Sequence, residues 1–286
     1  MNYDSPRELS RILQEHSIGL KKRWGQNFLI DRNVRAAIAN LVTAPSGSIV
    51  WEVGPGLGAM TVKLLARGYA VTAFELDRGF IRILKEEFGD RLEIVAGDVT
   101  RTWRAHAERA GTPEAVLGNL PYSAASAILA AFLEAHVVPA QTVVMVQREV
   151  AERMVAAPGS KDYSSFSVLV QSHAIVRKQL NVAPSAFYPR PEVSSTIVEL
   201  TPRSVPLSVT DWNLFHELTR TLFVSRRKTI WNNLRGSVIE SRIGKENLLS
   251  AVDGLSFPVS VRGETLSPEE VAELANRLAP FDASRQ

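Results

Sequence analysis

The sequence contains no cysteine and no apolar stretch long enough to cross a bilayer. Without thiols, disulfides and thiolate metal sites are excluded, and a reducing cytoplasm is the simplest location. The N-terminus is polar and lacks the apolar core of a signal peptide, so no membrane partner is expected. The five histidines have no metal-ligand spacing. These absences favour a cytoplasmic protein that works without a metal.

Basic residues are present in two clusters, although the net charge of the 286 residues is only +3. Five cations lie between Lys21 and Arg35 against one acid, and six lie between Arg220 and Arg242 against one acid. Such clusters suit a phosphate backbone, whereas a single charge run is more commonly a solvated helix face. The two clusters together favour a nucleic-acid partner.

Apolar runs that alternate with helical patterns predict a mainly parallel sheet, and therefore an α/β fold. The predicted strands cover residues 48–53, 70–74, 92–96, 115–117, 141–147, 174–182 and 195–200. Prolines and a serine between Thr201 and Pro206 mark a linker, after which the pattern is helical throughout. The sequence thus predicts a first domain over residues 1–203, including the basic N-terminal segment, and a smaller all-helical domain over 204–286.

A glycine-rich segment, Gly54-Pro55-Gly56-Leu57-Gly58, follows the first of these strands. Glycines let a backbone turn tightly and approach a ligand closely. Glu75 ends the next strand, 21 positions after Gly54, where an acid can bind the hydroxyls of a ribose. With Ala59 at the third position of the fingerprint, the pattern fits a nicotinamide dinucleotide as well as S-adenosylmethionine. It indicates only an adenosine-containing cofactor.

Two later features favour methyl transfer over hydride transfer. Asp98 follows the strand at 92–96, where it can accept from a cofactor's adenine amine or simply cap a helix. Residues 118–122 read GNLPY at the end of the next strand. An Asn side-chain oxygen and a backbone carbonyl can accept the two hydrogens of an exocyclic amine, and a tyrosine can stack on the base. Asn and Pro are also common in ordinary β-turns, which remains the alternative for this segment alone.

Eight segments in order along the chain resemble the bacterial small-subunit ribosomal RNA adenine dimethyltransferases. They are KKRWGQNFL (21–29), EVGPGLGAMT (52–61), FELD (74–77), AGD (96–98), GNLPY (118–122), AFYPRPEV (186–193), FVSRRKTIWNNL (223–234) and GETLSPEEVAELAN (263–276). The resemblance covers nearly the whole chain. It implies a Rossmann-like class I S-adenosylmethionine-dependent methyltransferase sheet with a smaller C-terminal all-helical domain.

The resemblance also implies a reaction and its partners. Two methyl groups would pass from S-adenosylmethionine to the exocyclic N6 amine of each of two adjacent adenosines in the 3′-terminal hairpin loop of 16S rRNA, leaving S-adenosylhomocysteine. The substrate would be the 30S particle or its precursor, and the protein would take part in small-subunit biogenesis. A cytoplasmic monomer is expected.

Site residues follow from the same resemblance. The implied cofactor contacts are Asn27, Leu29, Gly54, Glu75, Asp98 and Asn119. The implied catalytic residues are Asn119, Leu120, Pro121, Tyr122 and Phe187. The implied RNA contacts are Lys21, Lys22, Arg23, Arg226, Arg227 and Lys228. In this interpretation Asn119 and the Leu120 carbonyl polarise the target amine, while Tyr122 and Phe187 hold the base. For Phe187, simple packing of its proline-rich loop is the alternative.

Three other functions compete with this prediction. A protein of this fold can bind a pre-ribosome without turnover, although intact Gly54, Glu75, Asp98 and Asn119 argue against an inactive enzyme. The large-subunit rRNA dimethyltransferases of antibiotic resistance share the core and GNLPY, but the GETLSPEE stretch favours the small-subunit group. A nicotinamide oxidoreductase is the most distant alternative. The clearest departure from the family lies at residues 161–165, outside the predicted pocket.

Overall fold

The computed structural model describes residues 1–20 and 26–282, and the chain forms two compact units. The first unit comprises Met1–Phe132, Val137–Ala151 and Val176–Pro202, and the second comprises Leu133–His136, Glu152–Ile175 and the chain from Arg203 onward. The predicted boundary after residue 203 lies close to the last of these junctions. The division differs from the prediction because Leu133–His136 and Glu152–Ile175, which precede this boundary, also belong to the second unit.

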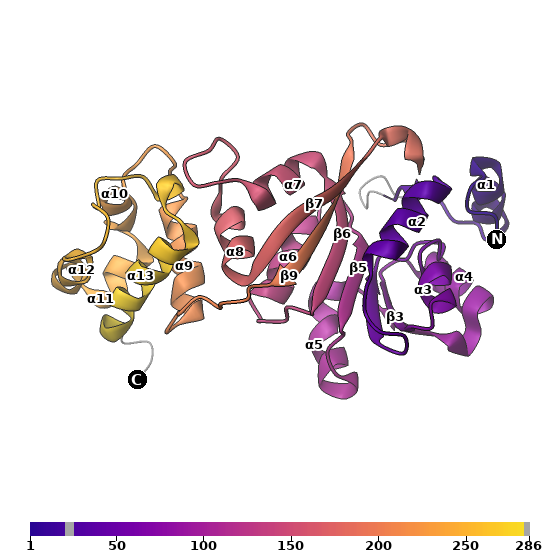
Figure 1. Ribbon diagram of the computed structural model, residues 1–286, viewed down its shortest axis with the longest axis horizontal. Helices are drawn as coiled ribbons and strands as arrows, with labels where there is room; N and C mark the ends of the chain where they lie inside the picture. The colour runs from indigo at the N-terminus through magenta and orange to yellow at the C-terminus, as the bar shows by residue number, and fades with distance from the viewer. Residues whose placement is uncertain (21–25, 283–286) are drawn as a thin grey trace. The chain divides into compact units, whose positions relative to one another are not determined.

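A seven-stranded sheet forms the centre of the first unit, with the strand order β4-β3-β2-β5-β6-β9-β7 (Figure 1). The strands are β2 (Ile49–Val53), β3 (Ala70–Glu75), β4 (Leu92–Ala96), β5 (Ala115–Asn119), β6 (Gln141–Gln147), β7 (Ala174–Val182) and β9 (Ser195–Pro202). Strands β2 to β6 pair in parallel, whereas β9 runs antiparallel to β6. This arrangement confirms the predicted α/β class. It also brings the carboxyl ends of β2, β3, β4 and β5 to one edge of the sheet.

Helices precede and connect these strands because the sequences there place apolar residues at helical spacing. They are α1 (Pro6–Glu15), α2 (Arg32–Leu41), α3 (Thr61–Ala66), α4 (Arg78–Phe88), α5 (Val99–Ala110), α6 (Ala125–Leu133) and α7 (Arg148–Val155). Side chains from α2, α3 and α4 pack on the strands, as Ile38, Leu64 and Leu84 do in one apolar core. Among residues 1–20 and 26–282, no helix combines the length and apolar character needed to span a membrane.

A second, two-stranded sheet joins segments far apart in the chain. Strand β1 (Phe28–Leu29) pairs antiparallel with β8 (Phe187–Tyr188), so that Phe28 lies opposite Tyr188 and Leu29 opposite Phe187. The sequence does not predict either strand, because two residues carry no periodicity. The pair fixes the end of the basic N-terminal segment against the proline-rich loop that follows β7.

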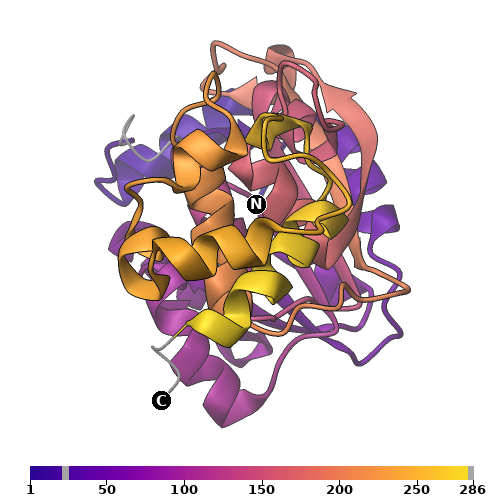
Figure 2. The same ribbon diagram turned by 90° about the vertical axis from the view of Figure 1, so that its left-hand side faces the viewer.

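The second unit is helical around its own apolar core. Its helices include α8 (Ser165–His173), α9 (Trp212–Leu222), α10 (Ile230–Leu234), α11 (Val238–Ile243), α12 (Lys245–Val252) and α13 (Pro268–Leu278). Helix α13, yellow in Figures 1 and 2, lies beside the orange α9 and also contacts α8. The Tyr163 hydroxyl donates to the Leu266 carbonyl at 2.8 Å, and Tyr163 and Val168 are fully buried in this core. This burial places the segment before β7 in the second unit.

Candidate active site

The glycine-rich loop after β2 turns sharply at the carboxyl edge of the sheet. Gly54, Gly56 and Gly58 have φ of +71°, +57° and +89°, which favour glycine. A Cβ at Gly58 would also lie 2.5 Å from the Phe88 ring, inside contact distance. A Cβ at Gly54 would lie 3.5 Å from the Asn119 carbonyl oxygen, so the ends of β2 and β5 approach closely there. Gly54 and Gly56 of this loop line a cavity at the sheet edge.

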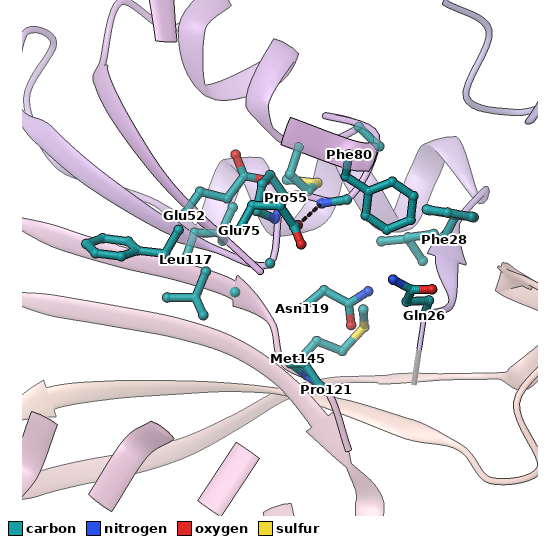
Figure 3. Close-up of a pocket in the computed structure, with 18 of the residues that line it drawn as sticks. Gln26, Phe28, Glu52, Pro55, Glu75, Phe80, Leu117, Asn119, Pro121 and Met145 are labelled. Atoms are coloured by element: carbon teal, nitrogen blue, oxygen red, sulfur yellow. Dashed lines mark hydrogen bonds between the residues drawn. The ribbon is translucent and has the colours of Figure 1, made fainter. Parts of the chain in front are cut away.

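Glu75, the last residue of β3, carries a buried carboxylate beside this loop. It is 7% exposed, and it accepts hydrogen bonds from the Gly56 N–H at 3.2 Å and the Asp77 N–H at 2.8 Å. Burial is the largest cause that raises the pKa of Glu75, to about 7. In Figure 3 its carboxylate lies among the pocket residues, beside Pro55. Two oxygens held in this way can accept from a bound ligand.

Asp98 follows β4 and has two roles in the structure. One carboxylate oxygen accepts from the Thr100 N–H at 2.9 Å and from the Thr100 hydroxyl at 2.8 Å, which caps α5. The residue also lines the same cavity as Glu75. The helix-cap alternative is therefore correct, and it does not remove Asp98 from the pocket.

The GNLPY segment begins at the end of β5, and hydrogen bonds position several of its groups. The Asn119 amide nitrogen donates to the Asn27 carbonyl at 3.2 Å, which leaves the side-chain oxygen as an acceptor. The Leu120 N–H donates to the Met145 carbonyl at 3.1 Å. The Tyr122 hydroxyl is 2.7 Å from the Ser195 hydroxyl. Asn119 is thus oriented by the segment that precedes β1, with its amide in the pocket region seen in Figure 3.

One cavity of about 210 Å³ in the first unit collects the predicted cofactor residues. Its lining includes all six of them, namely Asn27, Leu29, Gly54, Glu75, Asp98 and Asn119. Pro121 also lines it, and Ala124 and Met145 extend the wall toward β6. Residues separated by more than ninety positions are thus brought together at the edge where open α/β sheets bind ligands.

Phe187 does not line this cavity, and its contact with a target base stays a prediction. It is 3% exposed and packs in the apolar core of the first unit, opposite Leu29 in the β1–β8 pair. The pairing turns the side chain inward, because alternate residues of a strand point to opposite faces. The loop-packing alternative describes Phe187 in this structure. The Leu120 side chain is also buried, at 2% exposed, which leaves only its backbone available for the predicted role.

Two residues that the sequence analysis missed as candidates also line the cavity: Glu52 and Tyr3. Glu52 is 3% exposed in β2, accepts from the Thr61 hydroxyl at 2.6 Å, and has its pKa raised by burial to about 7. An acid inside the apolar run Ile49–Val53 was the available signal, since buried strands seldom carry charge without a reason. Tyr3 has no comparable signal in the sequence.

The predicted RNA contacts differ in their surroundings. Lys21, Lys22 and Arg23 lie outside the described residues. Arg226 is held within the second unit, because its guanidinium donates to Glu264 at 2.6 Å and to the Lys161 carbonyl at 2.8 Å. Arg227 and Lys228 are exposed. All three cations are exposed, and Arg226 also has hydrogen-bond partners within the second unit.

Comparisons with known proteins agree with this geometry. The family description "Ribosomal RNA adenine dimethylase" matches residues 18–253. A curated Ribosomal RNA small subunit methyltransferase A from Treponema pallidum is 42% identical over 233 residues, covering 82% of this chain and 81% of the relative. A protein of the same name from Treponema denticola is 40% identical over 271 residues, covering 93% of this chain and 92% of the relative.

A solved structure of a related protein has a similar fold. The crystal structure of a dimethyladenosine transferase from Plasmodium falciparum superposes with a TM-score of 0.69 at 26% identity, covering 85% of this chain and 94% of that chain. The family match spans most of the chain and includes every cofactor residue gathered at the cavity. The chain belongs to the ribosomal RNA adenine dimethylase family.

Proposed function

We propose that this protein transfers methyl groups from S-adenosylmethionine to the N6 amines of two adjacent adenosines in the 3′-terminal hairpin loop of 16S rRNA. The observation that carries the proposal is the convergence of six family cofactor positions, including Asn119 of GNLPY, on one cavity. The relatives named above are methyltransferases of the ribosomal small subunit, which supports the choice of 16S rRNA over large-subunit RNA. An acid at β4 and an Asn-Pro turn at β5 give no reason to expect hydride transfer.

The residues around the cavity fit the proposed methyl donor. S-adenosylmethionine supplies a methyl group on a positively charged sulfonium, and Glu52 and Glu75 place two buried carboxyls in the same cavity. Glu75 would accept from the ribose hydroxyls and Asp98 from the adenine amine. The turn at Gly54 would admit the methionine portion, because no side chain projects there. Asn27 and Leu29 would close the cavity over the donor.

Asn119 would act on the target base. As the target nitrogen becomes tetrahedral, its hydrogen bond to the Asn119 side-chain oxygen and to the Leu120 carbonyl would strengthen, which favours the transition state. The bond from the Asn119 amide nitrogen to the Asn27 carbonyl supports this role, because it fixes which end of the amide remains an acceptor. Pro121 lines the cavity, and the anchored Tyr122 hydroxyl leaves its ring as a stacking surface. Alignment supplies most of the acceleration, since a sulfonium is already activated.

Recognition of the RNA would depend on its phosphates and on an unpaired loop. A target base must leave its stack to enter a pocket, so a loop adenosine costs less to extract than one in a duplex. Arg227 and Lys228 are exposed cations suited to phosphate, and Lys21, Lys22 and Arg23 stay predicted contacts. The proposed substrate is the 30S particle or its precursor. The protein would act as a cytoplasmic monomer and would have an added role in subunit biogenesis.

The deciding experiment uses labelled S-adenosylmethionine with 30S particles from a strain that lacks the modification. Mapping the product should place dimethyladenosine at two adjacent positions of the 3′-terminal hairpin loop. The Asn119→Ala variant serves as the control for background methylation. Label in 50S particles instead would assign the protein to large-subunit chemistry. Stable binding of 30S particles without any transfer would make it an assembly factor.

A further inference from the structure

The residues that line the cavity follow the order of the strands along the sheet. Asp98, Glu75 and Gly54 lie at or just after the ends of β4, β3 and β2, which are consecutive in the strand order. Asn119 ends β5, the next strand, and Met145 belongs to β6, the strand beyond it. In the proposed function the first three residues hold the methyl donor and Asn119 holds the target amine. The β6 side of Asn119 therefore lies on the side of the target.

Four residues, Asn119, Pro121, Ala124 and Met145, line this part of the cavity, and we call them the acceptor wall. Met145 lies opposite Asn119 in the register of β5 and β6, and in Figure 3 these two side chains lie together with Pro121. The Ala124 N–H donates to the Pro121 carbonyl at 2.9 Å, so the chain folds back after GNLPY and Ala124 also reaches the cavity.

The acceptor wall contains one polar side chain, the amide of Asn119. The other members are a proline, an alanine and a methionine, which present apolar atoms and a thioether. The buried carboxyls of Glu52 and Glu75 belong to β2 and β3 instead. Removing apolar groups from water is favourable, so a wall of this composition suits a methyl group.

A second transfer to the same amine places a methyl group at this wall. In each transfer the target nitrogen forms a bond to the methyl carbon, the carbon–sulfur bond of the donor breaks, and the nitrogen releases one proton to water. The monomethylated amine therefore keeps one N–H, which can bond to either the Asn119 side-chain oxygen or the Leu120 carbonyl. Its methyl group must then occupy space beside the other acceptor. Because the bond to the Asn27 carbonyl holds the Asn119 amide, neighbouring residues must provide that space.

Ala124 and Met145 are suited to provide it. Ala124 is half-buried and has the smallest side chain of the acceptor wall. Its neighbours differ, because Ser123 is exposed, Ala125 is fully buried, and the cavity lining includes neither of them. Met145 is 2% exposed, and an unbranched thioether side chain can adapt to groups of different size.

We propose that Ala124 and Met145 determine product specificity, because the cavity beside them accepts the first N6-methyl group and lets the monomethylated adenosine realign with a second donor. This inference rests on the proposed function, and it adds the residues that decide between one transfer and two. A larger side chain at position 124 fills the space that the methyl group needs. The unmethylated amine has no methyl group to place, so its reaction is less affected.

Ala124→Val tests the proposal on 30S particles from a strain that lacks the modification. Mass spectrometry of digested rRNA over a time course measures monomethyladenosine and dimethyladenosine, and hence the rates of the two transfers. The second rate should fall roughly 10-fold or more relative to the first, since one methylene in an apolar pocket has an effect of this size. Monomethyladenosine should accumulate. Calorimetric affinity for S-adenosylmethionine should not change, because the donor lies on the other side of Asn119.

Ser123→Val is the matched control, because it places the same side chain at an exposed neighbouring position and should leave both rates unchanged. If Ala124→Val lowers the melting temperature, Ala124→Ser adds only one atom and should shift the product ratio in the same direction. Met145→Val shortens the facing side chain, so it should restore part of the second transfer in the Ala124→Val background. Lack of restoration would overturn the role of Met145.

The outcomes separate this inference from the proposed function. Equal slowing of both transfers in Ala124→Val, or weaker binding of S-adenosylmethionine, would overturn the assignment of Ala124. A wild-type reaction that yields no dimethyladenosine would overturn the proposed function itself.

Discussion

At the scale of single residues, the orientation of the Asn119 side-chain amide is set by one hydrogen bond. Its sequence position predicts an acceptor at the end of β5, but either end of an amide could face the ligand. The bond from its nitrogen to the Asn27 carbonyl decides the matter, because a carbonyl can only accept. Asn27 in turn is placed by the β1–β8 pair that begins at the next residue. The predicted function of one side chain thus depends on a segment ninety-two positions away.

Asn119→Ala should separate chemistry from RNA binding. Removing one preorganised transition-state partner commonly costs on the order of 100-fold or more in rate. Single-turnover methylation at saturating donor measures this loss, and filter binding of 30S particles should show nearly unchanged affinity, since phosphate contacts elsewhere dominate it. Near-normal methylation would refute the proposed role. Parallel loss of particle binding would leave GNLPY as a structural turn.

Glu52 and Glu75 are two buried carboxyls on neighbouring strands, and burial is the main cause that raises the pKa of each to about 7. The charge of Glu75 contributes further to the raised pKa of Glu52. Their ionisation therefore opposes folding of the ligand-free protein. A cationic methyl donor favours the same ionisation. The two carboxylates therefore lower the stability of the ligand-free protein and strengthen binding of the donor.

The free energy of unfolding of the ligand-free protein should therefore fall as the pH rises and these carboxyls ionise. Carboxyls with a folded pKa near 7 and an unfolded pKa near 4.5 hold protons more tightly when folded. Their stabilising contribution is complete below about pH 4.5 and is lost as the pH rises through about 7. Glu52→Gln cannot titrate, so its stability relative to wild type should increase between pH 5 and pH 8 by on the order of 1–3 kcal/mol. Urea unfolding without ligand at both pH values measures it; identical pH profiles would contradict the raised pKa.

At the scale of elements, the short β1–β8 pair changes the meaning of several residues. It places Leu29 at the cavity, in agreement with its predicted cofactor contact, and Phe187 in the core. The strand β2 is predicted because its residues form an apolar run, and the helix α13 because its apolar residues recur at helical spacing. A two-residue strand has no period, so only its partner defines it.

Helix α13 offers a local test of stability in the second unit. The Ser267 hydroxyl accepts from the Glu270 N–H at 3.2 Å, and the Glu270 carboxylate accepts from the Ser267 N–H at 2.7 Å, which forms a capping box. Ser267→Ala should lower the free energy of unfolding by about 0.5–2 kcal/mol. Thermal and urea denaturation measure it, with exposed Ser204→Ala as the control. No difference between the two variants would mean that the box contributes nothing.

At the scale of the whole molecule, the second basic cluster contains one cation with partners in the second unit and two that are predicted RNA contacts. Arg226 bonds Glu264 and the carbonyls of Ser160 and Lys161, and so joins separate segments of the second unit. Arg227 and Lys228 are exposed and have the character of phosphate contacts. Charge changes in one short run should therefore have different consequences for stability and for RNA binding.

Reversing Arg227 and Lys228 to glutamate should weaken 30S binding and flatten its salt dependence by roughly one unit of slope per lost phosphate contact. Stability and affinity for S-adenosylmethionine should not change. Arg226→Glu is the matched variant: it places a carboxylate beside Glu264 and should lower the free energy of unfolding by about 0.5–1.5 kcal/mol, because solvent screens this partly exposed pair. If the double variant kept the full salt slope, the cluster would be a solvated face.

The sequence by itself determined the α/β class, the order of the strands along the chain and the glycine-rich turn, and it predicted Glu75, Asp98 and Asn119 as ligand contacts, which the structure gathers at one cavity. These follow from local periodicity and from the rule that parallel strands present their carboxyl ends at one edge. Tertiary structure alone decided the inward turn of Phe187, the structural role of Arg226, the direction of the Asn119 amide and the presence of Tyr3 at the cavity. Each depends on a partner remote in sequence, namely Leu29, Glu264, Asn27 and Arg35. No local pattern encodes such a pairing, because it exists only once the two segments have been packed together.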